Sequence, residues 1–385
     1  MPETREQDDL AHTVQDLVRI NSVNPGLVAG APGEGEIAGY VERWLKGAGL
    51  DATVHETRTG RPGVVCRLSG SGGGRSLILN AHLDTTGVQG MRDPFSGELR
   101  EGRVYGRGAY DMKGSLAACM WAMRALAAGD SRLRGDVLFA AVADEEDASL
   151  GTVDLLASVR ADAAIVTEPT ELDVCVAHKG FSWFEVETFG HAAHGSRPEE
   201  GVDAIMRMGQ VLAHLKLLES RLSAREPHPL LGKPSLHAAT ISGGTGASTY
   251  AAHCRLLVER RTVPGETVRA ALEELGEILG LLSGIDPDFR AALRSLLSRE
   301  PFEAIPSSPL VSTLMGETQS VLGHPPKKVG RSFWMDAALF SAAGIDTAVI
   351  GPSGAGAHAD VEWVDVESVV MLAKILQKTA KAYCG

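Results

Sequence analysis

The sequence predicts an α/β protein: a main domain with a mostly parallel central sheet covered by helices, and an inserted ferredoxin-like α+β domain. Up to about residue 180, and again near the C-terminus, short apolar runs alternate with stretches of helical periodicity. Continuous apolar runs of this length are typical of strands buried on both faces of a parallel sheet. Beyond residue 180 apolar and polar residues alternate, as in strands with one solvent-exposed face.

The main domain is predicted from its strands and helices in chain order. Apolar or β-rich runs predict strands at 51–56, 63–70, 76–84, 137–143, 163–167 and 347–350. Helical periodicity predicts helices at 6–20, 35–48, 112–128, 149–158, 309–322 and 365–382. Strands that alternate with helices in this way indicate a layered α/β domain.

The inserted domain is predicted from the order of its elements, β-α-β-β-α-β, which resembles a ferredoxin-like unit. These elements cover 181–189, 202–219, 235–242, 253–261, 266–282 and 289–297. We therefore expect the segments 1–179 and 305–385 to form the main domain and 180–304 to form the insertion.

Composition narrows the class of protein and its partners. The chain has 385 residues, 44% hydrophobic and 22% charged, which is enough for two domains and a large buried core. The net charge of −12, without a basic patch, argues against nucleic acid. Because no apolar run reaches about 18 residues and the polar N-terminus is unlike a signal peptide, we expect a cytoplasmic protein that binds no membrane.

Five scattered cysteines, without a C-x-x-C motif, indicate free thiols in a reducing compartment. They are Cys66, Cys119, Cys175, Cys254 and Cys384. Any metal site must therefore use histidine, aspartate and glutamate.

Five short motifs each offer a histidine or a carboxylate, ligands that suit Zn²⁺, Co²⁺ or Mn²⁺. They are NAHLD around His82 and Asp84, GRGAYDMKG around Asp111, ADEED around Glu145 and Glu146, VTEPT around Glu168, and GAGAHAD around His358. Most of them follow predicted strands, and open α/β sheets bind ligands beyond the carboxyl ends of their strands. One motif alone is more typical of a solvated strand end or an acidic turn. Their joint occurrence predicts a metal site.

The motifs contain the parts of a two-metal site. Two ions about 3.5–4 Å apart can hold a substrate oxygen and a nucleophilic water, which requires a shared carboxylate, further ligands and a base. Asp111, in a glycine-rich turn, is the predicted bridging carboxylate. His82 and Glu168 would complete the ligands of one ion, and His358 and Glu146 those of the other.

Two carboxylates remain for supporting and catalytic roles. Asp84 is two residues from His82, so its side chain is expected on the same side of the strand, where it would accept the second ring N–H of the histidine. Of the adjacent Glu145 and Glu146, one is expected to bind metal and the other to act as general base and later general acid.

These motifs resemble the M20 metallopeptidase family, which includes acetylornithine deacetylase, succinyl-diaminopimelate desuccinylase, aminoacylase and glutamate carboxypeptidase. The resemblance covers nearly the whole chain and implies a catalytic main domain with a lid and dimerisation domain at 180–304. It implies that Glu145 is the base and that the peptide bond after Asp111 is cis. It also implies the ligand and supporting roles argued above for six residues: His82, Asp84, Asp111, Glu146, Glu168 and His358.

The resemblance extends to two motifs of the insertion. GHAAHGSRPEEGVDAI (190–205) is similar to the family's lid motif, in which His194 matches the histidine that polarises the scissile carbonyl, often in the partner subunit's site. In the segment 241–266, Arg261 falls on the arginine that binds the substrate carboxylate, a task for which the forked guanidinium is suited.

Departures from the family's pattern lie around the substrate. Many members have Asn at the position of Ser248 and Pro at that of Ala251, and many have Ser or Thr where Met335 precedes Asp336. Because the metal ligands are retained, we expect hydrolysis to be retained and leave the identity of the substrate open.

The leading hypothesis is a dinuclear metal-dependent hydrolase that cleaves the amide bond of an N-acyl amino acid. The expected cofactor is two divalent ions, Zn²⁺ before Co²⁺ or Mn²⁺, and the expected assembly is a homodimer through 180–304. A dipeptidase or carboxypeptidase on the same site is the first alternative. An inactive binding or scaffold protein on this fold is the second, and it predicts the loss of a ligand or of the base.

Overall fold

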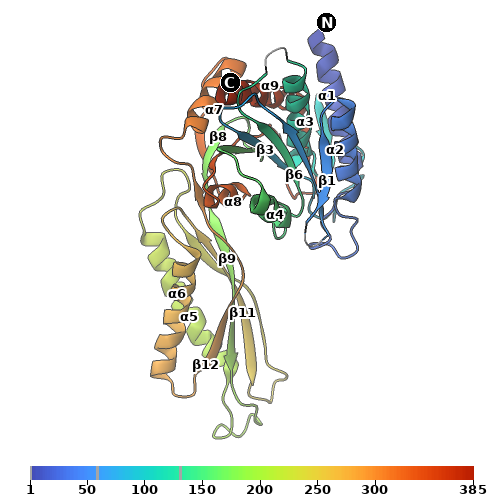
Figure 1. Cartoon of the computed structure of the whole chain (residues 1–385). Coiled ribbons are helices and arrows are strands. Elements are labelled where there is room, and N and C mark those ends of the chain that lie inside the picture. Colours follow the sequence, from blue (N-terminus) through green and yellow to red (C-terminus); the bar gives the residue numbers. More distant parts are fainter. Residues whose placement is uncertain (1, 58–59, 130–131) are drawn as a thin grey trace. The chain divides into compact units, whose positions relative to one another are not determined.

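The computed structural model describes residues 2–57, 60–129 and 132–385. The chain divides into two compact units (Figure 1). The first unit comprises Met1–Val176, Ala304–Val329 and Met335–Gly385, and the second comprises Ala177–Glu303 and Gly330–Trp334. In the described residues, no helix combines the length and apolar character that a membrane crossing requires.

A mixed sheet forms the centre of the first unit. Its strands lie in the order β1 (Ala52–Glu56), β2 (Pro62–Leu68), β6 (Val137–Val142), β3 (Leu77–His82), β7 (Ala163–Val166), β15 (Asp346–Val349), β8 (Val174–His178) and β13 (Phe302–Glu303), with β14 (Lys328–Arg331) beside β8. The central strands β6, β3, β7 and β15 are parallel, whereas β1, β2 and β8 pair antiparallel. The predicted mostly parallel centre is confirmed.

Helices bury the central strands completely, which is why β6 and β7 are wholly apolar and β3 is apolar except for Asn80 and His82. These helices are α1 (Pro2–Arg19), α2 (Gly35–Gly47), α3 (Gly114–Ala127), α4 (Leu150–Ser158), α7 (Pro309–Leu322), α8 (Ala337–Ala342) and α9 (Val366–Cys384). One core joins α1, α2, α3, α7 and α9 to alternate residues of β3, Leu77, Leu79 and Ala81. The shorter α4 and α8 pack against β6, β7 and β15.

A small antiparallel sheet, which the sequence did not predict, lies beside the main one. Its strands lie in the order β16 (Gly354–Ala355), β17 (Trp363–Asp365), β5 (Arg103–Tyr105) and β4 (Glu98–Arg100). Its members are two or three residues long, too short for a periodic signal. The pairing of β17 with β5 joins the chain just after His358 to the chain just before Asp111.

The second unit has the predicted order of elements. They are β9 (Gly180–Phe189), α5 (Ala204–Ala224), β10 (Ser235–Gly243), β11 (His253–Thr262), α6 (Val268–Ile285) and β12 (Arg290–Arg299). The strands form an antiparallel sheet in the order β10-β11-β9-β12. Both helices share one core with alternate residues of β9 and β11, so the inserted α+β fold is confirmed.

Candidate metal centre

Parallel strands bring the predicted residues to one edge of the sheet. His82 ends β3, Glu145 and Glu146 follow β6, and Glu168 follows β7. The remaining two come from irregular backbone. Asp111 lies in the turn Ala109–Lys113, which leads into α3 and has non-helical backbone angles at Asp111 and Met112, and His358 has a left-handed φ of 61° in the loop between β16 and β17.

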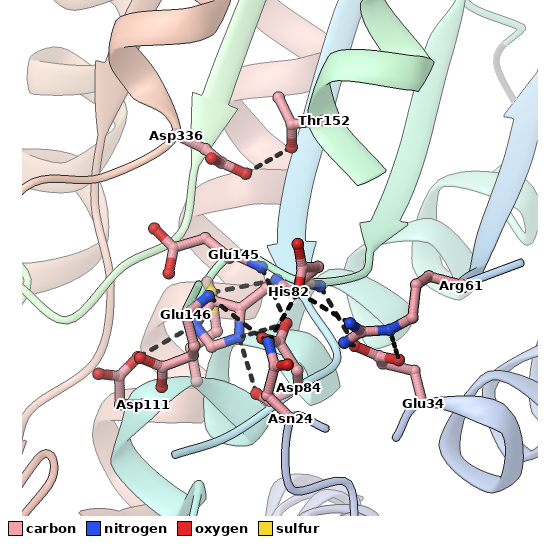
Figure 2. A network of polar contacts seen from close by, with 12 residues as sticks. Asn24, Glu34, Arg61, His82, Asp84, Asp111, Glu145, Glu146, Thr152 and Asp336 are labelled. Carbon is pink, nitrogen blue, oxygen red and sulfur yellow. Dashed lines mark hydrogen bonds and ion pairs between the residues drawn. The ribbon is translucent and has the colours of Figure 1, made fainter. Parts of the chain in front are cut away.

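Asp111 lies between the two histidines, as Figure 2 shows in part. His82 Nε2 is 3.1 Å from Asp111 Oδ1, and His358 Nε2 is 3.3 Å from Asp111 Oδ2. Each carboxylate oxygen therefore faces a different imidazole, which is the arrangement that a bridging ligand requires. The peptide bond between Asp111 and Met112 is cis, in agreement with the prediction.

The other carboxylates divide between the two histidines. Glu168 Oε1 is 3.6 Å from His82 Nε2, and Glu146 Oε2 is 3.0 Å from His358 Nε2. Ligand atoms also lie within 4.8 Å of one another in two groups of three, His82 with Glu145 and Glu168, and His82 with Asp111 and Glu146. The Glu145 carboxylate thus lies among the possible ligands, and its role as base stays a prediction.

Burial and mutual repulsion perturb the titration of these groups. Burial raises the pKa of Glu145, Glu146 and Glu168, and neighbouring carboxylates raise it further. Hydrogen bonds to Asp111 and Glu146 raise the pKa of His358 to about 10. Burial alone would lower the pKa of His82, but Asp111 and the charges of Glu168 and Asp84 raise it well above the usual value.

The residues fit a divalent cation. All donors are imidazole nitrogens or carboxylate oxygens, which suit Zn²⁺, Co²⁺ and Mn²⁺. Glu146 Oε1 is buried and has no hydrogen-bond partner among the described residues, an expensive state for a carboxylate oxygen that a cation would relieve. The buried carboxylates of the site also repel one another, and two divalent ions would supply the positive charge that offsets this repulsion.

Asp84 differs from the expectation. The ring Nδ1–H of His82 donates to the backbone carbonyl of Asp84 at 2.9 Å, whereas the carboxylate is 3.7 Å from Nδ1. The carboxylate instead accepts the backbone N–H groups of Glu145 and Glu146, both at 3.1 Å. It therefore holds the segment that carries the two glutamates, while the carbonyl orients the imidazole.

Asp84 belongs to a buried network of hydrogen bonds that includes Asn24, Arg61 and Glu34 (Figure 2). Asn24 Nδ2 donates to Asp84 Oδ2 at 2.7 Å and to Asp144 Oδ1 at 3.0 Å. Arg61 donates to Asp144 Oδ1 at 2.9 Å and makes a double contact with Glu34, whose carboxylate also accepts the Asp144 N–H at 3.2 Å. All acceptors of the network face donors, as buried carboxylates require.

Asp336 is a further buried carboxylate near the site, where Thr152 donates to it. Burial raises its pKa to about 6. In the sequence, Asp336 was noted only because Met335 precedes it where many family members have Ser or Thr. Asp144 lay in the quoted ADEED motif without a role of its own, and Asn24, Arg61 and Glu34 were not predicted, because their partners lie far along the chain.

The two remaining predicted residues, His194 and Arg261, belong to the second unit. His194 is exposed, and its Nδ1 accepts the Ser196 backbone N–H at 3.2 Å. Arg261 lies on the open face of the sheet, 2.8 Å from Glu259 and over the Phe181 ring. A substrate carboxylate would have to share this guanidinium with Glu259.

Comparison with known proteins gives a family and a fold. The model of peptidase family M20/M25/M40 matches residues 78–382. Acetylornithine deacetylase of Proteus mirabilis is 30% identical over 353 residues, covering 89% of this chain and 88% of the relative. N-formyl-4-amino-5-aminomethyl-2-methylpyrimidine deformylase of Halalkalibacterium halodurans is 26% identical over 411 residues, covering 99% and 95%.

A solved structure shares the fold along nearly its whole length. It is the Bacillus subtilis YXEP protein, described as a dinuclear metal binding peptidase from the M20 family. The TM-score is 0.76 at 15% identity, and the match covers 98% of each chain.

Proposed function

We propose that this chain, which belongs to peptidase family M20/M25/M40, is a dinuclear metal-dependent hydrolase that removes the acyl group from an N-acyl amino acid. The observation that carries the proposal is the position of Asp111, whose two oxygens face His82 and His358 at 3.1 and 3.3 Å. The deacetylase and deformylase relatives support an acylated amine as the substrate.

The mechanism divides between the two units. Two divalent ions, held by His82, Asp111, Glu168, Glu146 and His358, would supply Lewis acidity to the amide carbonyl and to the attacking water. Glu145 takes a proton from this water and later gives it to the leaving amine, because it is the glutamate of the adjacent pair that the ligand assignment leaves free.

Residues of the second unit act on the substrate. His194 donates to the carbonyl oxygen as negative charge develops there. Arg261 binds the carboxylate of the amino acid. Asp84 holds the backbone of Glu145 and thereby the direction of the base.

The test is a substrate panel. The chelated protein, supplied with Zn²⁺, Co²⁺ or Mn²⁺, is incubated with N-acyl amino acids that differ in acyl chain and with dipeptides, and released amine is measured. Metal-dependent release from N-acyl amino acids is expected, with Zn²⁺ as the proposed native ion. Release from dipeptides alone would favour the peptidase alternative, which the M20 peptidase fold of the Bacillus subtilis protein supports. No release and no bound metal would favour the inactive scaffold.

A homodimer through residues 180–304 is proposed on the surface of the second unit. A groove of 710 Å³ between α5 and α6 has a lining of mixed polarity, in which Leu217 and Leu281 are both more than half exposed. Exposed apolar surface of this kind marks interaction sites. Leu281→Glu is expected to give a monomer in light scattering, whereas Val54→Glu, on the first unit, is expected to leave the dimer intact.

The proposed compartment is the cytoplasm. All five cysteines are free and buried, which supports the prediction of a reducing environment.

A further inference from the structure

Glu362 is a buried glutamate close to the centre that none of the roles above uses. It precedes β17, four residues after His358, and is 1% exposed. Its Oε1 accepts the backbone N–H groups of Tyr110 and Asp111, both at 3.0 Å. Its Oε2 accepts the backbone N–H of Gly108 at 3.0 Å. One carboxylate thus satisfies three amides of the turn that carries the predicted bridging ligand.

Arg107 completes this arrangement from the other chain segment. Its Nη1 donates to Glu362 Oε2 at 2.6 Å, and its Nη2 donates to the backbone carbonyl of Ala359 at 3.2 Å. Ala359 directly follows His358. The guanidinium, 2% exposed, therefore lies between the turn of Asp111 and the loop of His358, and its fork geometry fixes their distance.

The backbone ties the same two segments. Gly106 N–H donates to the Glu362 carbonyl at 3.1 Å, and β5 pairs with β17 in register through Tyr105 and Trp363. Segments 106–111 and 358–362 thus form one hydrogen-bonded body that carries Asp111 and His358. Of the other predicted ligands, His82 and Glu168 lie at the ends of β3 and β7, outside this hydrogen-bonded body.

We infer that Glu362 and Arg107 are positioning residues that place Asp111 against His358 and so determine the affinity for the second ion, the one on the His358–Glu146 side. The inference rests on the two-ion site proposed above. Loss of the pair should displace His358 from Asp111, now 3.3 Å apart. The ion on the His82–Glu168 side shares Asp111 but keeps two ligands at the ends of strands of the central sheet, so it should lose less affinity.

The test variant is Glu362→Gln. Glutamine keeps the volume but replaces one acceptor oxygen with an NH₂ donor, which then faces backbone N–H groups or Arg107. Chelated wild type and variant are titrated with Co²⁺, and bound ions are followed by electronic absorption and by metal analysis. We expect the second ion to bind about 10–100-fold more weakly and the first ion, which keeps His82 and Glu168, to be weakened less.

Two further variants keep the test decisive. Arg107→Lys retains the charge but not the fork, and it should weaken the second ion in the same selective way if Glu362→Gln fails to fold. Glu266→Gln is the matched control in the second unit, where Glu266 accepts from the buried Arg260 and from the Val263 N–H. It should bind both ions as wild type does.

The outcomes separate the inference from the proposed function. Equal weakening of both ions in Glu362→Gln and Arg107→Lys, or no weakening, would overturn the positioning role. A wild type that binds fewer than two ions would overturn the two-ion site itself. Selective loss of the second ion, with thermal unfolding close to that of Glu266→Gln, would support the role, because a general loss of structure would not spare the first ion.

Discussion

At the scale of single residues, the adjacent carboxylates Glu145 and Glu146 have different surroundings despite their shared strand end. Glu146 contacts His358 at 3.0 Å, whereas Glu145 lies with His82 and Glu168. Both are held through their backbone N–H groups by Asp84. Substitution by glutamine keeps the size of each side chain and removes its charge, so it separates a base from a ligand.

Glu145→Gln is expected to lower kcat about 10²–10⁴-fold, the usual contribution of general base catalysis, and to leave two bound ions. Glu146→Gln is expected to lose metal from the His358 side as well as activity. Turnover and metal content of the two variants are measured side by side. Normal turnover in Glu145→Gln, or metal loss there instead of in Glu146→Gln, would exchange the two assignments.

Asn24 uses its amide as a donor between two carboxylates, so its nitrogen is the essential atom. Asn24→Asp would place a third negative charge against Asp84 and Asp144, and it is expected to destabilise the protein by at least about 1–3 kcal/mol. Asn21 is the matched control, since only its oxygen is used, accepting the Val23 N–H at 3.1 Å. Denaturant unfolding should show a loss for Asn24→Asp and little change for Asn21→Asp; similar losses would remove the proposed role of the amide.

At the scale of elements, the parallel strands β3, β6 and β7 end at one edge and deliver most of the ligands. The segment that contains His194 differs, because it lies between β9 and α5 of the second unit. No strand of the first unit holds it near the metal ligands. His194 could therefore act on a substrate bound by the same chain or on one bound by a second copy of the chain.

His194→Ala is expected to lower kcat strongly and to leave metal content unchanged, since an oxyanion donor contributes about 2.7–4 kcal/mol. If the histidine acts across a dimer, mixing this variant with Glu145→Gln should restore activity, because one site of the mixed dimer holds both groups. Rates are measured after confirmed subunit exchange. An inactive mixture would exclude action in trans, and a fully active His194→Ala would exclude the role.

At the scale of the whole molecule, the metal centre links stability to pH. In the metal-free chain the pKa values of His82, His358 and the three glutamates are raised, while that of Asp111 is lowered. The folded state therefore holds more protons than the unfolded state above about pH 4.3, the ordinary value for glutamate. The stability of the metal-free protein should fall as pH rises from there.

Bound metal ions replace these protons, so the stability of the metal-loaded protein should not fall in this way as pH rises. We expect the gap in thermal midpoint between loaded and chelated protein to widen from about pH 5 to about pH 8. Ion binding should also release protons into a weakly buffered solution. A gap that narrows over this range would contradict the expected direction of the linkage.

Sequence alone determined the features that depend on local patterns. Apolar runs, helical periodicity and the change of pattern near residue 180 predicted the parallel centre, the inserted α+β unit and the strand ends where the metal-type residues lie. These signals are reliable here because β3, β6 and β7 are buried throughout, and strands buried on both faces consist mostly of apolar residues.

Only the tertiary structure decided which atoms meet. The strands β4, β5, β16 and β17 are too short to be periodic, yet they join the segments of Asp111 and His358. The Asp84 carboxylate was expected to accept the ring N–H of His82, but it accepts the backbone N–H groups of Glu145 and Glu146. The partner of a buried polar group is the nearest donor or acceptor in space. Asp111 and Glu362, 251 residues apart along the chain, are therefore neighbours that no local pattern can reveal.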